Sequence, residues 1–258
     1  MWESIQLSIT DLILLAVAGV FTGIINTLAG SGSLITLPIF IFICGLPPSV
    51  ANATNRIGVL MQSLVGTGKY YKTMPEIFKG SVWLTIPAVL GALLGSKIAV
   101  DLNEEVMRFT LGGLMVLMLF ILLLKPQSWL KTGTAGGENR ETWKSILIFF
   151  AIGIYGGFLQ AGVGLFLLAA MVLVSNYSLK QANGLKLMLV LFFTIPSLIL
   201  FFYYGKVHVF YGVLMGVFQA IGAWLGVRFV SKIDNADKWI YRLLIVIVAV
   251  SALKFFIY

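Results

Sequence analysis

The sequence is poor in the residues on which most metal proteins and many enzymes rely. Its 258 residues include one cysteine, Cys44, and one histidine, His208. A single cysteine cannot form a disulfide within the chain or a cysteine metal site, and Cys44, in an apolar run, is expected to be a small core residue. A single histidine cannot supply paired haem ligands, and no serine or threonine is spaced to form a catalytic group with it. We therefore expect no enzyme activity, no metal and no cofactor.

Charged residues are scarce as well. They make up 11% of the chain, whereas apolar residues make up 59%, and the mean hydropathy is +0.99. This composition is more apolar than the core of a soluble protein requires, and it indicates an integral membrane protein.

The apolar runs predict an all-α, polytopic membrane protein with about ten helical segments, given that a span needs about 20 residues. The first five lie near residues 10–28, 33–45, 50–67, 79–99 and 106–124, and the second five near 144–160, 164–175, 182–203, 208–230 and 239–257. The second segment of each set is short and follows a glycine-rich turn. We therefore expect the first two segments of each set to form a re-entrant hairpin that turns inside the membrane.

The two sets of segments resemble each other in sequence. Residues 91–95 (GALLG) recur as residues 222–226 (GAWLG), 131 positions later, and the glycine turn at 30–32 is matched by one at 162–164. Because five segments is an odd number, the second repeat would be inverted relative to the first. Inverted repeats are typical of secondary transporters, whose substrate site lies where the repeats meet. The predicted boundaries are 1–124 for the first repeat, 125–143 for a cytoplasmic linker and 144–258 for the second repeat, in one membrane domain.

The distribution of Lys and Arg predicts the orientation. Placing the N-terminus outside puts twelve of the 18 cations on the cytoplasmic side and four on the outer side. Both termini of this multi-pass cell-membrane protein are therefore expected outside. No cation precedes Arg56, so the first segment is expected to be kept rather than cleaved as a signal peptide. Topology and anionic lipid headgroups explain the net charge of +8 without nucleic acid.

The two remaining cations, Arg56 and Lys186, lie inside apolar segments. They follow Gly32 and Gly164 by 24 and 22 residues, which are matching places in the two repeats. A charge within a membrane helix costs about 2.5 to 3.5 kcal/mol and normally has a partner. All ten Asp and Glu residues fall at segment ends or in loops, so the missing counter-charge could be an anionic substrate. The alternative is that both side chains snorkel to the membrane interface.

The glycine turns point to the same kind of ligand, because backbone N–H groups at the start of a helix attract anions. Nearby hydroxyl and amide side chains would add donors. The alternative for the glycines is close packing of helices, which is the preferred interpretation for Gly91, Gly95, Gly222 and Gly226. The predicted substrate site consists of Arg56, Lys186, Gly30, Ser31, Gly32, Ser33, Asn55, Gln160, Gly162 and Gly164.

Several stretches resemble a known family. Residues 23–38 (GIINTLAGSGSLITLP), 45–48 (GLPP) and 51–56 (ANATNR) are similar to the TauE/SafE family of sulfite and organosulfur anion exporters, in the four-toluene sulfonate uptake permease superfamily. Residues 153–164 and 182–186 also fit, so the resemblance covers most of the chain. It implies export of sulfite, sulfoacetate, a related organosulfonate or thiosulfate, with the glycine turns, Arg56 and Lys186 at the site.

Other functions stay open at this point. They are a channel or importer for another small anion and a membrane-embedded protein without transport activity. The expected partners are the small sulfur anion and membrane lipids, not nucleic acid, and the chain could form a homo-oligomer. No Asp or Glu is expected deep in the bundle to relay protons. An anion leaving a negative cytoplasm gains about 2.3 kcal/mol per charge per 100 mV, so uniport-like export by alternating access would suffice.

Overall fold

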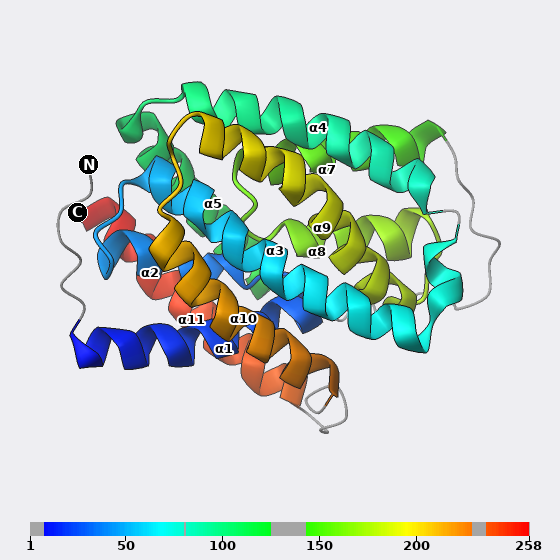
Figure 1. Cartoon of the computed structure of the whole chain (residues 1–258), viewed down its shortest axis with the longest axis horizontal. Coiled ribbons are helices and arrows are strands. Elements are labelled where there is room, and N and C mark those ends of the chain that lie inside the picture. The colour runs from blue at the N-terminus through cyan, green and yellow to red at the C-terminus, as the bar shows by residue number, and fades with distance from the viewer. Residues whose placement is uncertain (1–7, 80, 125–142, 229–235, 258) are drawn as a thin grey trace.

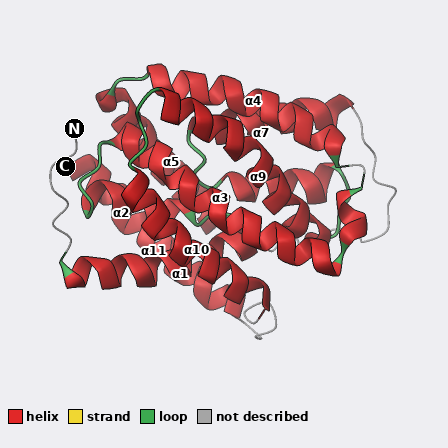
Figure 2. Ribbon diagram, viewed as in Figure 1, coloured by secondary structure: helices red, strands yellow, loops and turns green. Residues whose placement is uncertain are grey.

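The structure is a computed structural model that describes residues 8–79, 81–124, 143–228 and 236–257. Every regular element in these residues is a helix (Figure 2). The first half comprises α1 (Ile9–Ala29), α2 (Ser33–Phe42), α3 (Pro48–Thr73), the 3₁₀ helix η1 (Pro75–Phe78), α4 (Val82–Asp101) and α5 (Glu104–Leu123). The second half comprises α7 (Trp143–Phe158), α8 (Val163–Ala169), the π-helical turn η2 (Ala170–Val174), α9 (Leu179–Tyr203), α10 (Val209–Arg228) and α11 (Ala236–Ile257).

This architecture confirms the prediction of an all-α, polytopic membrane protein. The described part of the chain holds ten α-helices, and five of them, α1, α4, α5, α9 and α10, are long and apolar enough to cross a membrane. Large apolar side chains such as Leu94, Phe109 and Ile199 are exposed on the outside of the bundle, as expected for a surface that faces lipid. The boundaries of the two repeats stay predictions, and residues 125–142 of the proposed linker lie outside the described part.

Local sequence signals set several helix ends. Ser8 and Asp11 form a capping box at the start of α1, and Ser178 and Gln181 form another at the start of α9. Helix α1 ends at Gly30, whose φ of 73° is left-handed and therefore suits glycine. Pro48 is the first residue of α3, a position where its missing N–H is not needed.

The helix bundle has two ends, and each end holds a different set of helix connections. The Glu104 end is where α4 ends and α5 begins, and the η1 end is where α3 ends and α4 begins (Figure 1). Helix α1 begins and α2 ends at the Glu104 end. Helix α7 begins at the η1 end, and the chain returns there after α8, because Gly184 near the start of α9 lies against Ile77 of η1. The two short hairpins therefore enter the bundle from opposite ends.

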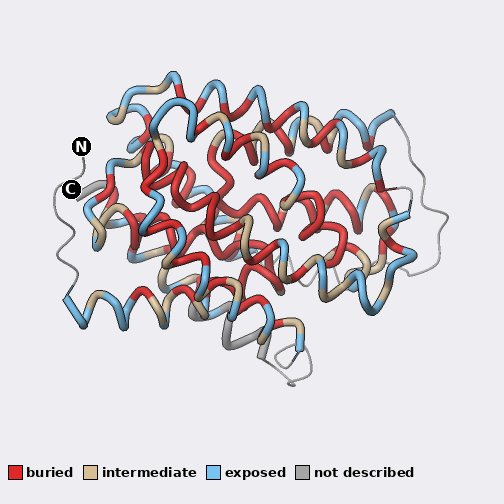
Figure 3. Tube along the Cα trace, in the orientation of Figure 1, coloured by how far each residue is buried: buried red, intermediate tan, exposed pale blue. Residues whose placement is uncertain are grey.

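Glycines join the two halves through two helix pairs, α1 with α10 and α4 with α7. A methyl group at Gly23 would overlap the backbone of Gln219, and one at Gly222 would overlap that of Val20. In the other pair, a methyl at Gly91 would overlap the backbone of Phe150. Gly95 and Gly226 lie in the same two contacts. Close packing is therefore confirmed for the repeated glycines, and each pair takes one helix from each half. Figure 3 shows that the buried residues concentrate in the middle of the bundle.

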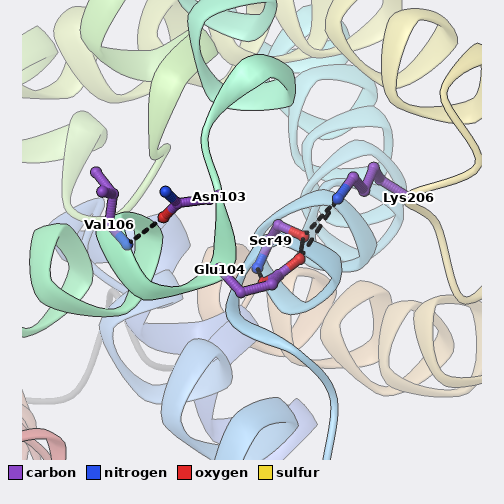
Figure 4. Close-up of polar contacts among 5 residues, drawn as sticks. All are labelled: Ser49, Asn103, Glu104, Val106 and Lys206. Carbon is purple, nitrogen blue, oxygen red and sulfur yellow. Dashed lines mark hydrogen bonds and ion pairs between the residues drawn. The ribbon is translucent and has the colours of Figure 1, made fainter.

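A polar cluster ties three loops together at the Glu104 end (Figure 4). The Ser49 N–H donates to Glu104 Oε2 at 2.9 Å, and the Ser49 hydroxyl donates to Oε1. Lys206 Nζ lies 3.4 Å from Glu104 Oε1 and 3.3 Å from Ser49 Oγ. Asn103 Oδ1 accepts from Val106 N at 2.8 Å and so caps α5. The Glu104 carboxylate thus stabilises the start of α3, where a negative charge is favourable.

Replacing Lys206 by Met should have a small effect on stability. The Lys206 and Glu104 side chains are 30% and 44% exposed, and exposed ion pairs contribute about 0 to 1 kcal/mol. We expect the free energy of unfolding in detergent to fall by less than about 1 kcal/mol. Glu104→Gln, which removes the charge at the start of α3, should cost more than Lys206→Met. A larger loss in Lys206→Met than in Glu104→Gln would show that the ion pair, rather than the capping of α3, stabilises this end of the bundle.

Candidate substrate site

The turns of the two hairpins touch each other inside the bundle. A Cβ atom on Gly30 would lie 2.5 Å from the Cα of Gly164, and one on Gly164 would overlap Gly30 in return. Both turns use left-handed backbone, with φ of 73° at Gly30, 69° at Gly162 and 58° at Gln160. The two halves therefore meet backbone to backbone, at the place where the sequence predicts the substrate site.

Arg56 of α3 is fully buried, and its guanidinium binds the C-terminal end of α7. Its Nη1 donates to the carbonyl of Gly156 at 3.1 Å, and its Nη2 donates to those of Gly157 and, at 3.4 Å, Phe158. The guanidinium also lies 4.6 Å from the centre of the Phe201 ring, which is a favourable position for a cation. Only its Nε has no hydrogen-bond partner within the described residues.

Lys186 of α9 makes the matching contact with α1. Its Nζ donates to the carbonyls of Asn26 and Thr27 at 3.1 and 3.0 Å, and to Asn183 Oδ1 at 2.9 Å. Each buried cation therefore binds the carbonyl end of the first helix of the other half, where the helix dipole places a partial negative charge of about half a unit.

These contacts settle how the two cations are held. Arg56 is 0% exposed and Lys186 is 1% exposed, so the snorkelling alternative is wrong for both. Neither has a carboxylate partner in the described ion pairs. The hydrogen-bond partners of both side chains in the described structure are backbone carbonyls and an amide oxygen, which carry partial negative charge and no full charge.

A small closed cavity lies beside Lys186. Its polar lining comes from both hairpins and from α3 and α9, namely Asn26, Ser33, Ser63, Gln160 and Lys186, and its other lining residues are Val59, Val163, Gly164, Leu187 and Val190. Its volume is about 10 Å³, which is roughly the space that one water molecule needs. Two of its polar atoms, Ser63 Oγ and Gln160 Oε1, are buried without a hydrogen-bond partner among the described residues.

The structure divides the predicted site residues into two groups. Ser33, Gln160, Gly164 and Lys186 line the cavity. The others are not among its lining residues: Arg56, Gly30, Ser31, Gly32, Asn55 and Gly162. Two polar lining residues, Asn26 and Ser63, were missed. Ser63 follows Arg56 by seven residues and so lies on the same face of α3, which is a signal that the sequence does contain.

Hydrogen bonds fix the serines and amides around the first turn. Asn26 Oδ1 accepts from Gly32 N at 3.3 Å. Asn55 donates to Ser33 Oγ at 3.0 Å and accepts from Thr36 Oγ1 at 2.6 Å. In the second turn, Gln160 Nε2 lies 2.7 Å from Thr194 Oγ1. The N–H of Gly32 is therefore already hydrogen-bonded to Asn26. The cavity is lined by polar side chains rather than by this turn amide.

A larger hollow among the described residues is a groove between α1, α2 and α11, with a volume of about 620 Å³. Apolar side chains such as Leu14, Phe21 and Ile247 line most of it. It faces outward, where large apolar side chains are exposed, so it suits hydrocarbon rather than a small hydrated anion.

Comparison with known proteins identifies the family of the chain. The family described as "Sulfite exporter TauE/SafE" matches residues 15–255. The chain belongs to the TauE/SafE family. It is therefore a multi-pass membrane transporter and not an enzyme, as predicted.

Several curated relatives of this TauE/SafE protein match along most of their length. The probable membrane transporter protein ORF9 of a Sinorhizobium species is 26% identical over 242 residues, which cover 93% of this chain and 90% of the relative. A probable membrane transporter protein of Haemophilus influenzae is 26% identical over 253 residues, covering 95% and 93%. The probable membrane transporter protein YfcA of Escherichia coli is 27% identical over 237 residues, covering 90% and 84%. No solved structure matches the chain.

Proposed function

We propose that the protein exports a small sulfur-containing anion, such as sulfite, sulfoacetate or a related organosulfonate, across the cell membrane by alternating access. One observation supports this proposal most strongly. A buried cavity lies where hairpins of opposite halves touch, and Lys186 is one of its lining residues. The family description names sulfite exporters, which favours a sulfur oxyanion among small anions.

The polar groups of the cavity fit an oxyanion. Lys186 supplies the charge, and the hydroxyls of Ser33 and Ser63 and the amides of Asn26 and Gln160 supply neutral donors. No Asp or Glu is among the lining residues. Sulfite and sulfonate groups carry three oxygens on one sulfur, so they can accept bonds from several of these groups at once. Bonds from a cation to an oxyanion are about twice as strong as bonds between neutral groups.

The size of the cavity supports alternating access. A space of about 10 Å³ is too small for sulfite, so the helices around it must separate before the anion binds. The helix pairs α1–α10 and α4–α7 each contain one helix from each half. We therefore expect these pairs, rather than whole repeats, to move as the rigid bodies. A channel would instead keep a continuous opening.

The membrane potential can drive export without a coupled ion. The proposed orientation places the Glu104 end outside and the η1 end in the cytoplasm, following the positive-inside pattern of the sequence. A dianion that leaves a cytoplasm at −100 mV gains about 4.6 kcal/mol, at about 2.3 kcal/mol per charge.

Flux measurements in proteoliposomes test this function. We expect sulfite or sulfoacetate to move faster than acetate or chloride, and to move faster still when a potassium gradient with valinomycin makes the donor side negative. A protein that moves none of the sulfur anions above the rate of protein-free liposomes, or that moves chloride equally well, would contradict the proposal.

A further inference from the structure

Two buried carboxamides outside the cavity have no hydrogen-bond partner. Gln62 of α3 and Gln219 of α10 are both 0% exposed, and neither the nitrogen nor the oxygen of either side chain is bonded to any described residue. Buried polar groups are bonded in the large majority of cases, because leaving one unpaired destabilises the folded protein. Four unpaired atoms on two helices that pack together therefore indicate that water or a polar ligand reaches this place during the working cycle.

Gln219 lies at the interface between α3 and α10. A Cβ atom on Gly58 would lie 2.5 Å from Gln219 Oε1 and 3.0 Å from Gln219 Nε2. The Gln219 amide therefore packs directly against the backbone of Gly58. Gln62 stands one helical turn further along the same face of α3. Glycine at position 58 leaves the space that the Gln219 side chain occupies.

These residues belong to a stripe along α3 that passes the cavity and continues to the η1 end. Its members are small or polar and recur at helical spacing: Asn55, Gly58, Gln62, Gly66 and Lys69. Asn55 donates a hydrogen bond to Ser33, which lines the cavity. At the other end of the stripe, Lys69 Nζ lies 5.7 Å from the centre of the Trp224 ring.

A second cation, Arg228, lies 4.9 Å from the centre of the same Trp224 ring. The stripe therefore ends beside two cations, Lys69 and Arg228, which would attract an anion from solution.

The matching interface, between α4 and α9, lacks these amides. The spacing of 131 residues that relates Gly91 to Gly222 relates Gln219 to Ala88, and the spacing of 130 that relates Arg56 to Lys186 relates Gln62 to Phe192. Ala88 is fully buried like Gln219, so close packing of the fold does not require an amide there, whereas Phe192 is 47% exposed and does not share the buried surroundings of Gln62. The buried amides are therefore a feature of one of the two matching interfaces.

We propose that the interface between α3 and α10 is the hydrated route by which the anion passes between the Lys186 cavity and the η1 end, with Gln62 and Gln219 donating their amide hydrogens to it. This inference rests on the proposed function, because it takes the transported species to be an anion. The donors are neutral, so they can stabilise a passing anion without holding it as firmly as a cation would. Lys186 remains the fixed charge at the end of the route.

Cysteine labelling tests the route without reference to any particular anion. Cys44 is the only cysteine, so a Cys44→Ser protein is a suitable background for Gln62→Cys and Gln219→Cys. Ala88→Cys is the matched control, because Ala88 is also 0% exposed and stands at the place of Gln219 in the other half. The probe is a charged, membrane-impermeant methanethiosulfonate added to one face of sealed vesicles at a time, and it reacts only with thiols that water can reach.

We expect both glutamine positions to be labelled at least tenfold faster than Ala88→Cys, and only from the face at which α3 ends. Labelling as slow as that of Ala88→Cys, or labelling only from the opposite face, would overturn the route. If flux of all sulfur anions is absent while the labelling pattern holds, the proposed substrate fails and the hydrated route stands.

A second measurement separates a transport role from a structural one. Gln62→Leu and Gln219→Leu replace unpaired amides by apolar groups of similar size, so the variants should melt at the same or a higher temperature than the wild type. Their anion flux should nevertheless fall at least tenfold. Normal flux in both variants would exclude the two amides from the route.

Discussion

Replacing Lys186 by Met should nearly abolish anion flux while the protein still folds. The Lys186 ammonium group is the one cation that lines the cavity in the described structure, and removing one partner of a buried charge pair costs about 3 to 5 kcal/mol. A loss of that size in the bound state corresponds to a decrease in flux of at least about 100-fold, at 1.4 kcal/mol for each factor of ten. The flux per amount of folded protein in proteoliposomes, with melting temperatures measured in detergent, checks this result.

Two controls distinguish the charge from its packing. Lys186→Arg keeps the charge and should retain part of the flux. Arg56→Met removes the other buried cation, which binds the carbonyl end of α7 and does not line the cavity. It should therefore lower the melting temperature more than Lys186→Met does. Flux at the wild-type rate in Lys186→Met would show that this cation only caps α1.

Replacing Gly30 by Ala should destabilise the protein by about 2 to 5 kcal/mol, and replacing Gly164 by Ala should destabilise it by about 1 to 3 kcal/mol. A methyl group on Gly164 would lie 2.5 Å from the carbonyl oxygen of Gly30, and backbone cannot move aside as a side chain can. Overpacking of this kind costs about 1 to 3 kcal/mol. Gly30 carries a further penalty of about 1 to 2 kcal/mol, because its φ of 73° is left-handed.

Gly113→Ala is the matched control for these substitutions. Gly113 lies in α5, and no atom lies within 4 Å of a Cβ added there. Alanine is favoured over glycine in a helix by about 1 kcal/mol, so this variant should melt at the same or a higher temperature. If Gly30→Ala and Gly164→Ala melt like Gly113→Ala, the turns do not touch as described.

Much of the fold could be predicted because the signals are local. Apolar runs place nearly every helix end within a few residues, and the largest difference is α3, which continues to Thr73 rather than residue 67. The last turns of α3 hold Gly68, Lys69 and Lys72, so they carry no apolar signal, although the helix continues there. The matched glycines predict close packing correctly, because only small residues allow backbones to approach at that spacing.

The partners of Arg56 and Lys186 could not be predicted from the sequence. Their backbone acceptors are carbonyls of the opposite half, 100 or more residues away along the chain. Every residue type has the same carbonyl, so no pattern of side chains reveals which ones will meet a cation. The same limit applies to the cavity, since Asn26 and Ser63 become neighbours of Lys186 only when three separate helices pack together.

The most direct test of the account is to locate the bound anion. Selenite resembles sulfite in charge and shape, and the anomalous scattering of selenium would mark its position in a crystal of the protein. We predict one peak within hydrogen-bond distance of Lys186 Nζ, between the turns that contain Ser33 and Gln160. A fully occupied peak elsewhere in the bundle, with none beside Lys186, would contradict the proposed site.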